Sequence, residues 1–356
     1  MSVFNYKFKI EDYKVKDSHR FNEKNLSDFL SDKLKEFSSI KAIGQFNVGQ
    51  SNPTFIIESS EGKRYVLRKK PPGDLLPSAH AVDREFKVQK ALYESDVPVA
   101  KMYLYCDDES IIGTSFYIME YIEGRVLEDT KLSGFEVEER KAIYDSMNKS
   151  LAALHNVDIK KVGLEDFGRP GSYFTRQIKR WSNQWELSKQ HDMPEMPLLK
   201  EWLIENIPDN DQTTIVHGDY RLGNLIYDLN EPKVIAVLDW ELSTLGHPLA
   251  DLGYNLMHHV QPTNLFSGLK GLNLKELGIP DINTYVKNYC DRVNRDFIDP
   301  TFYIVFSLYR NVAILEGVLA RGRAGNASSS LAEERGALGP VLAELSWSLV
   351  KENNLD

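Results

Sequence analysis

The chain has 356 residues and a mass of 40.7 kDa, which exceeds the length at which a single hydrophobic core usually stops growing, so two cores or two lobes are expected. An apolar share of 42% and a charged share of 27% exclude a disordered or fibrous protein. The net charge is −9, and the 43 Lys and Arg residues are spread among 52 Asp and Glu residues, which excludes the basic footprint of a nucleic-acid-binding protein.

The N-terminal segment, residues 1–20, alternates charged and aromatic residues and lacks the apolar stretch of a secretory leader. No run of about 18 uncharged apolar residues follows it. Cys106 and Cys290 are far apart and lack a C-x-x-C spacing, so we interpret them as reduced, buried thiols rather than as a disulfide or a zinc site. We therefore expect a cytoplasmic protein that does not bind membranes.

The first 122 residues predict an arm, a helix and a small α+β lobe. A stripe of apolar residues at spacings of three and four predicts an amphipathic helix; its members are Leu26, Phe29, Leu30, Leu34 and Phe37. Two extended runs, FIIESS and RYVLRKK, joined at residues 61–63, predict a β-hairpin. The segment AVDREFKVQKALYES predicts a helix, and VAKMYLYC and SFYIMEYI predict two further strands.

After Glu123 the pattern becomes mainly helical, with predicted helices over residues 136–155, 173–189 and 197–206. Residues 213–240 interrupt this pattern with two apolar strand-like runs around the turn at 229–232, which predicts a hairpin inside a helical domain. We therefore divide the chain into an N-terminal arm and helix (1–39), a small lobe (40–122) and a large lobe (123–356).

The run HGDYRLGN, from His217 to Asn224, has the H-x-D-x-x-x-x-N spacing of a kinase catalytic loop, and Asp239 ends the next predicted strand. Phosphoryl transfer from ATP needs a carboxylate for the attacking hydroxyl and Mg²⁺ against the phosphates. We expect Asp219 to be the catalytic base, with His217 and Arg221 as further catalytic candidates, and Asn224 and Asp239 to bind Mg²⁺. The loop alone could be an Asx-turn cluster, but the strand ending at Asp239 favours the kinase interpretation.

The phosphates also need a cation, and Arg68 on a predicted strand is the candidate, held by Glu85 on the following helix. The alternative is a purely structural ion pair. Lys69 is the alternative phosphate ligand, and because neighbouring residues of a strand face opposite sides, only one of the two can reach the cleft.

Two further segments are candidates for nucleotide contacts. A loop between two predicted strands could cover the phosphates with backbone N–H groups, or could be an ordinary hairpin turn; its candidate residues are Gly49, Gln50, Ser51 and Asn52. The extended run MEYIEG at the lobe boundary could offer backbone groups to the adenine edge through Met119, Glu120 and Ile122.

Together these motifs resemble the aminoglycoside phosphotransferase-like family of small-molecule kinases. The resemblance covers roughly residues 40–335 and depends on VGQSN, YVLRKKP, FYIMEYIEGR, LAALH, HGDYRLGN and LDWELSTLGHPLADLGY. It implies an α+β, bilobed protein-kinase-like fold, ATP and Mg²⁺ as cofactors, Met119 as the residue before the adenine-binding connector, and Asp251 as a brace for the catalytic loop. Arg68 stands where the family usually has lysine, and its planar guanidinium could place ATP slightly differently.

Within that family the chain is similar to the kinase portion fused to some acyl-CoA dehydrogenases. The similarity lies in LRKKPPGDLLPSAHAVDREF, in His247 before a proline, and in FYIVFSLYRNVAILEGVLARGRAGNASS. It implies a hydroxyacyl-CoA acceptor, phosphorylated on its 4-hydroxyl group, in 4-hydroxy acid catabolism. Aminoglycosides, sugars, other small alcohols and protein side chains are alternative acceptors. A non-catalytic, nucleotide- or acyl-CoA-binding pseudokinase is the alternative from another class, and a homodimer is the assembly left open.

The C-terminal helical region supplies candidate substrate contacts in Arg310, Arg321 and Tyr309, because guanidinium groups suit carboxylates and phosphates. Arg310 and Arg321 are eleven positions apart and would share a helical face, although helix caps or surface ion pairs would explain them equally well. Trp181 and Trp185 follow a basic stripe in YFTRQIKRW; they could border an acyl-CoA site or pack in the core.

Overall fold

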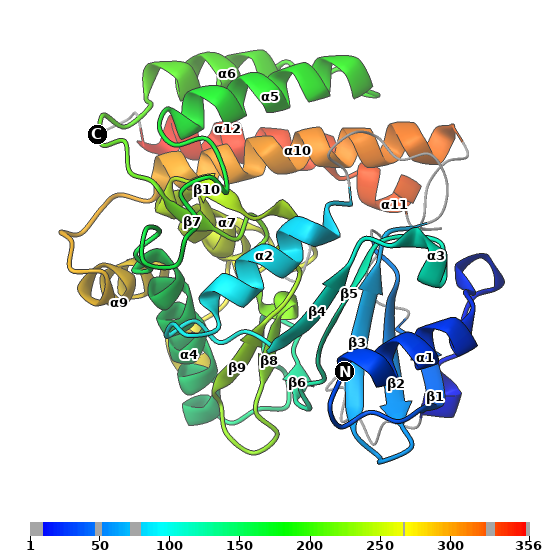
Figure 1. Ribbon diagram of the computed structural model, residues 1–356. Helices are drawn as coiled ribbons and strands as arrows, with labels where there is room; N and C mark the ends of the chain where they lie inside the picture. Colours follow the sequence, from blue (N-terminus) through cyan, green and yellow to red (C-terminus); the bar gives the residue numbers. More distant parts are fainter. Residues whose placement is uncertain (1–9, 47–51, 72–79, 266–267, 325–331, 354–356) are drawn as a thin grey trace.

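A computed structural model of the chain describes residues 10–46, 52–71, 80–265, 268–324 and 332–353. Within these ranges a small lobe built on an antiparallel sheet lies beside a larger, mainly helical lobe (Figure 1). This arrangement confirms the predicted α+β, bilobed fold.

The sheet of the small lobe has five antiparallel strands in the order β1-β2-β3-β5-β4. Their bounds are β1 Ile40–Gln45, β2 Thr54–Ser59, β3 Arg64–Lys69, β4 Met102–Cys106 and β5 Phe116–Glu120. Strands β2 and β3 form the predicted hairpin. Gly62 in its turn has a φ of 82°, a conformation that glycine adopts without a steric penalty.

Helices cover both faces of this sheet. Helix α1 (Glu23–Lys33) packs on one face, and α2 (Val82–Leu92) packs on the other; α3 (Glu109–Ile112) is a single turn. Because side chains of a strand alternate, Leu67 of β3 enters the cluster under α1, whereas Val66 enters the cluster beside α2. Helix α1 ends before Leu34 and Phe37 of the predicted stripe, yet Phe37 is still buried in the same cluster.

Helix α2 also fastens the small lobe to the large one. Arg84 Nη2 donates to the carbonyl oxygens of Phe167, at 2.6 Å, and of Ser243, at 3.3 Å. The Arg84 guanidinium lies over the Phe167 ring, 4.2 Å from its centroid. Lys87 on the same helix pairs with Asp166 at 2.7 Å. The position of α2 is therefore set by both lobes.

The large lobe is a helical assembly around α10, which contacts α5, α7, α11 and α12 (Figure 1). The helices are α4 Val137–His155, α5 Tyr173–Ser188, α6 Glu195–Glu205, α7 Pro248–Val260, α8 Leu274–Leu277, α9 Ile282–Arg292, α10 Thr301–Arg323, α11 Ala332–Gly336 and α12 Gly339–Asn353. Helices α4, α5 and α6 correspond to the three predicted between 136 and 206.

Helix α10 is long and apolar enough, by length and composition, to cross a membrane. However, 83% of its most apolar window is buried inside the protein, against the helices just named. Burial within the large lobe accounts for this hydropathy, as it does in the core helix of a globular protein.

The strands of the large lobe differ in part from the prediction. Strands β8 (Leu225–Tyr227) and β9 (Val234–Val237) form the predicted hairpin, and β6 (Arg125–Val126) pairs with β8. The first of the two apolar runs predicted within residues 213–240 is not one strand. Residues 217–224 leave the sheet and separate β7 (Thr214–Val216) from β8. Strand β7 pairs instead with β10 (Thr244–Gly246), which the sequence did not predict.

Candidate active site

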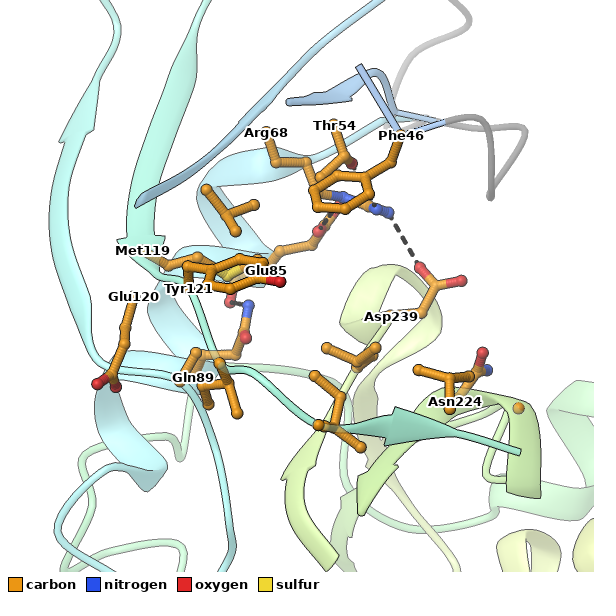
Figure 2. A pocket seen from close by; sticks show the side chains of 18 of the residues that line it. Phe46, Thr54, Arg68, Glu85, Gln89, Met119, Glu120, Tyr121, Asn224 and Asp239 are labelled. Carbon is orange, nitrogen blue, oxygen red and sulfur yellow. Dashed lines mark hydrogen bonds and ion pairs between the residues drawn. The ribbon is translucent and has the colours of Figure 1, made fainter. Parts of the chain in front are cut away.

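A cavity of about 270 Å³ lies between the lobes and is lined by both. Apolar side chains line one end, among them Val66, Ala100, Met119 and Ile226; polar side chains line the other, among them Arg68, Asn224 and Asp239. Figure 2 shows Met119 and Tyr121 on one side of this interlobe cavity and Asn224 and Asp239 on the other. An apolar slot that opens onto charged groups suits a ligand with a flat base and an anionic tail.

Arg68 connects the two lobes at the polar end. Its Nε lies 2.8 Å from Glu85 Oε2, and its Nη2 lies 3.0 Å from Asp239 Oδ1 (Figure 2). The same Nη2 lies 3.6 Å from Glu241 Oε2. Burial opposes its charge, but Glu85 and the other acidic groups outweigh burial and raise the pKa of Arg68. The guanidinium therefore stays charged inside the cavity and is available to phosphate oxygens.

Glu85 is buried on α2 and is held by three partners. Besides Arg68, its carboxylate accepts hydrogen bonds from Asn52 Nδ2, at 2.6 Å, and from the Tyr117 hydroxyl, at 2.9 Å. Burial raises the pKa of Glu85, while these donors favour its ionised form. Asn52 also bonds to His80 at 2.9 Å, so the end of the predicted phosphate-covering loop is tied to Glu85. Gly49, Gln50 and Ser51 of that loop lie outside the described residues.

The alternation of β3 resolves the choice between Arg68 and Lys69. Arg68 lines the interlobe cavity, whereas Lys69 lies among the residues under α1, with its ammonium group 5.9 Å from the centroid of the Phe21 ring. Burial lowers the pKa of Lys69. Lys69 is thus excluded as the phosphate ligand because its side chain lies on the opposite face of the sheet.

The loop between β7 and β8 brings Asp219 and Asn224 together. Asn224 Nδ2 donates to the Asp219 carboxylate at 2.8 Å, and Arg221 Nε lies 3.6 Å from the same oxygen. The backbone N–H of Leu238 donates to the Asn224 carbonyl at 2.8 Å, so the end of β9 lies directly beside Asn224. Asp239 follows at that end, and its φ of 63° is in the left-handed region that aspartate tolerates.

The donors in this corner fit a magnesium ion that is shared with phosphate oxygens. Because Asn224 uses its amide nitrogen toward Asp219, its amide oxygen is left to face the cavity, and Asp239 presents a carboxylate that is about one-third exposed. Mg²⁺ prefers such oxygen ligands and keeps several waters. Among the described residues, no group of three or more His, Cys, Asp and Glu side chains is arranged so that it could hold a metal ion.

His217 has a different role from the catalytic one predicted. Its side chain is fully buried, its Nε2 donates to the Leu238 carbonyl at 2.7 Å, and its Nδ1 accepts from the Asp219 N–H at 3.2 Å. Both ring nitrogens are occupied within the protein, which leaves none to exchange a proton with a substrate. His217 therefore shapes the loop that carries Asp219, with both ring nitrogens bonded within the protein.

Asp251 braces the catalytic loop, as the family resemblance implied. Its carboxylate, buried on α7, accepts the backbone N–H of His217, at 2.6 Å, and of Gly218, at 2.9 Å. His155 Nε2 lies 3.4 Å away, and His155 Nδ1 bonds to the Tyr289 hydroxyl at 2.7 Å. Burial alone would raise the pKa of Asp251, but the contacts with His155 and His217 outweigh it and lower this pKa.

We expect Asp251→Asn to destabilise the protein by about 3 kcal/mol at neutral pH, because an amide cannot accept both backbone N–H groups and leaves a buried donor unpaired. Because the pKa of Asp251 is lower in the folded protein, its contribution is present above the unfolded pKa and is lost as the pH falls through the folded pKa. The difference from wild type in urea denaturation should therefore shrink below about pH 3.8. Asp281→Asn is the control, because asparagine caps α9 as well as aspartate does; an equal loss in both variants contradicts the brace.

The predicted substrate contacts in α10 need correction. Tyr309 is fully buried and its hydroxyl bonds to Ser182 of α5 at 2.8 Å, so it belongs to the core and not to a substrate site. Arg310 is also buried and donates through Nη2 to the Gly218 carbonyl at 2.6 Å. Arg321 is exposed near the end of α10, so the two arginines do not form one basic site.

The two tryptophans of α5 pack in the core, which was the alternative to bordering an acyl-CoA site. Trp185 is buried, and Trp181 is half-buried with its ring 5.4 Å from the Arg310 guanidinium. Both indole N–H groups are shielded from solvent and have no hydrogen-bond partner among the described residues. Core packing therefore explains both positions in this structure.

The connector between the lobes lies along the apolar end of the interlobe cavity, which Met119, Glu120 and Ile122 all line. The Glu120 N–H donates to the Lys101 carbonyl at 2.9 Å, so this group is already used within the small lobe. The connector is thus in place for the predicted contacts to an adenine edge, with the Glu120 N–H as the exception.

Glu241, Phe46 and Tyr254 are among the residues of the site that the sequence analysis missed. Glu241, two positions after Asp239, reaches Arg68 from the 3₁₀ turn that follows β9. Phe46 directly follows β1 and lines the cavity. Tyr254 of α7 faces Asp219. Burial is the main cause that raises the pKa of the Tyr254 hydroxyl, and the nearby Asp219 carboxylate raises this pKa further. Glu241 could have been found from the D-x-E spacing, whereas the other two have no local signal.

Comparisons with known proteins agree with this geometry. Residues 42–269 match the sequence model of a family described as the phosphotransferase enzyme family. The mouse acyl-CoA dehydrogenase family member 10 is 44% identical over 85% of this chain, and the human member 11 is 41% identical over 87%. The chain spans only 28% and 41% of the length of these two relatives.

Two solved structures show the same fold. A Ralstonia eutropha protein, described provisionally as an aminoglycoside phosphotransferase, is 45% identical, with a TM-score of 0.85 and coverage of 94% of this chain and 99% of that one. A variant of the aminoglycoside phosphotransferase APH(4)-Ia, in a ternary complex with AMP-PNP and hygromycin B, has a TM-score of 0.58 at 15% identity, covering 90% of this chain and 98% of that one. The family resemblance inferred from the motifs is confirmed.

Proposed function

Because the chain belongs to the phosphotransferase enzyme family, we propose that it transfers the γ-phosphate of ATP to a hydroxyl group of a small molecule. The observation that carries this proposal is the meeting of Arg68, Asn224 and Asp239 at the polar end of one interlobe cavity, with Asp219 held beside them by Asn224. Phosphoryl transfer needs little more than positioning and charge stabilisation, and these four side chains supply both.

Each side chain has a separate task in this proposal. Asp219, held by Asn224, accepts the proton of the attacking hydroxyl. Arg68, fixed by Glu85, binds the phosphate oxygens. Asn224 and Asp239 would hold Mg²⁺, which when bound neutralises charge on the phosphates. Arg221 lies beside Asp219 and lines the cavity, so it is placed to meet negative charge there.

The favoured acceptor is a hydroxyacyl-CoA. Support comes from the relatives at 41–44% identity, whose names place them with acyl-CoA dehydrogenases, enzymes named for acyl-CoA thioesters. The exposed basic residues Lys179 and Arg180 on α5 suit the phosphates of a CoA moiety. The aminoglycoside complex among the solved structures shares only 15% identity with this chain and supports the fold rather than that acceptor. A cytoplasmic location is part of the same proposal.

A mass-spectrometric screen tests this function. The protein is incubated with Mg·ATP and, separately, with a 4-hydroxyacyl-CoA, a set of aminoglycosides and choline-like alcohols. We expect the 4-hydroxyacyl-CoA to gain one phosphate, and the same acyl-CoA without the hydroxyl group to gain none. Phosphorylation of an aminoglycoside instead would replace the acceptor and keep the kinase. No phosphate gain on any acceptor would favour a non-catalytic nucleotide-binding protein.

A further inference from the structure

The peptide unit that joins Gly218 to Asp219 is held at both of its polar groups. Its carbonyl oxygen, on Gly218, accepts a hydrogen bond from Arg310 Nη2 at 2.6 Å. Its N–H, on Asp219, donates to His217 Nδ1 at 3.2 Å. The preceding N–H, on Gly218, donates to Asp251 at 2.9 Å. The backbone next to Asp219 is therefore gripped by buried side chains from α7 and α10 and from the loop itself.

Gly218 needs these contacts because a glycine restricts its own backbone torsions little. Its φ is +84°, and a Cβ at this position would lie 2.8 Å from the Leu242 carbonyl oxygen. Glycine is thus required here, and glycine does not restrict the rotation that orients the next peptide plane. A rotation of that plane would turn the Asp219 carboxylate away from Asn224. The orientation of Asp219 must come from contacts outside the backbone.

Arg310 is built to hold its position. It lies in the middle of α10, is only 8% exposed, and its guanidinium is stacked between the rings of Trp181, at 5.4 Å, and Tyr254, at 5.2 Å. Among the described residues no carboxylate pairs with it, and the Gly218 carbonyl is its hydrogen-bond acceptor. Burying a guanidinium without a counter-ion is costly. The rings of Trp181 and Tyr254 do not themselves require a cation between them. The cost of burying the Arg310 charge is therefore offset only by the hydrogen bond to the Gly218 carbonyl and by the two cation–π contacts.

We infer that Arg310 is a positioning residue for phosphoryl transfer: by holding the Gly218 carbonyl, it fixes the peptide plane that aims Asp219 at the acceptor hydroxyl. The helix that carries it lies outside residues 42–269, the part that matches the family, so this contact adds a C-terminal element to the catalytic loop. Tyr254 faces both Arg310 and Asp219 and completes the group. The inference rests on the proposed function for its catalytic consequence but not for the loop geometry.

The first test measures the loop without any substrate. Amide hydrogen exchange of residues 217–224 is compared in the full chain for wild type, Arg310→Ala and Arg140→Ala. Arg140 is the matched control, because its guanidinium, like that of Arg310, donates to backbone carbonyls, in this case those of Leu132 and Leu277. Neither Arg140 nor Arg310 lines the cavity. We expect faster exchange at Gly218 and Asp219 in Arg310→Ala only. Equal protection in all three proteins would overturn the inference.

The second test measures turnover with Mg·ATP and a 4-hydroxyacyl-CoA. Arg310→Ala should lower kcat roughly 10- to 100-fold, since a displacement of about 1 Å in a reacting group costs that much, while the KM for ATP stays within about twofold. Guanidinium at a non-denaturing concentration should restore part of kcat by entering the space between Trp181 and Tyr254. Arg140→Ala should keep kcat within about twofold of wild type.

The outcomes separate this inference from the proposed function. An inactive wild type would refute the function and leave the exchange result to decide the role of Arg310. An active wild type with undiminished kcat in Arg310→Ala, or an equal loss in Arg140→Ala without guanidinium rescue, would refute only the inference. If Arg310→Ala does not fold, Arg310→Met serves instead, because it keeps an unbranched apolar side chain and loses every N–H donor to the Gly218 carbonyl; kcat equal to wild type in that variant would count against the positioning role.

Discussion

Asp219→Asn is expected to lower kcat by about 10²- to 10⁴-fold, the range that a general base contributes, while ATP binding stays close to that of wild type. Asparagine has the shape of aspartate and can still meet Asn224, but it cannot accept a proton from the acceptor hydroxyl. Asp219 is not among the residues that line the interlobe cavity, so nucleotide affinity should not depend on its charge. Steady-state kinetics and calorimetric titration with a non-hydrolysable ATP analogue measure the two quantities.

The control for this variant is Asp228→Asn in the turn between β8 and β9. Asp228 accepts backbone N–H groups from Asn230 and Glu231, and asparagine can keep an acceptor oxygen there. Asp228→Asn should leave kcat within about twofold of wild type, since substitutions at the surface usually change stability little. Undiminished turnover in Asp219→Asn would remove Asp219 from the role of base and would point to simple positioning of the acceptor.

The second large effect concerns the magnesium dependence of nucleotide binding. We expect Asp239→Asn and Asp239→Ala to weaken binding of Mg·ATP and to lower kcat by roughly 10²- to 10³-fold, the loss seen when one group that stabilises transition-state charge is removed. Asparagine tolerates the left-handed backbone of residue 239 better than alanine, so a loss shared by both variants reports the carboxylate and not backbone strain.

Nucleotide binding without magnesium supplies the internal control for residue 239. Asp239 Oδ1 pairs with Arg68 Nη2 at 3.0 Å, and removing the carboxylate frees that guanidinium for phosphate oxygens. ATP alone should therefore bind the variants as well as wild type or more tightly. Titration of ATP with and without Mg²⁺ distinguishes these cases, and an unchanged magnesium requirement in both variants would refute the metal-binding role.

The parts of the site that could be predicted are those fixed by local rules. The spacing of HGDYRLGN and the strand ending at Asp239 placed Asp219, Asn224 and Asp239 together because a hairpin brings its two ends side by side. The period of two along β3 left only one of Arg68 and Lys69 able to reach the cavity. Apolar periodicity likewise predicted α4, α5 and α6 to within two residues at each end.

The parts that could not be predicted depend on tertiary partners. Helical spacing placed Arg310 and Arg321 on one face, but it could not show that Arg310 faces the loop at Gly218, 92 positions earlier, or that Tyr309 packs against Ser182. His217 belonged to a predicted catalytic motif, and only its hydrogen bond to the Leu238 carbonyl oxygen shows that its ring supports the loop. Strand β10 is three residues long and carries no pattern of its own.

The fastening of α2 to the large lobe through Arg84 bears on the energetics of nucleotide capture. Glu85 is the next residue, so the anchor that seats this helix also sets the carboxylate that steers the Arg68 guanidinium. In the proposed function, an incoming triphosphate would meet a cation that is already held in position, and it would not first have to immobilise a mobile helix. Little conformational entropy remains to be lost on association, and the affinity for the nucleotide then reflects the contacts themselves rather than the work of assembling them.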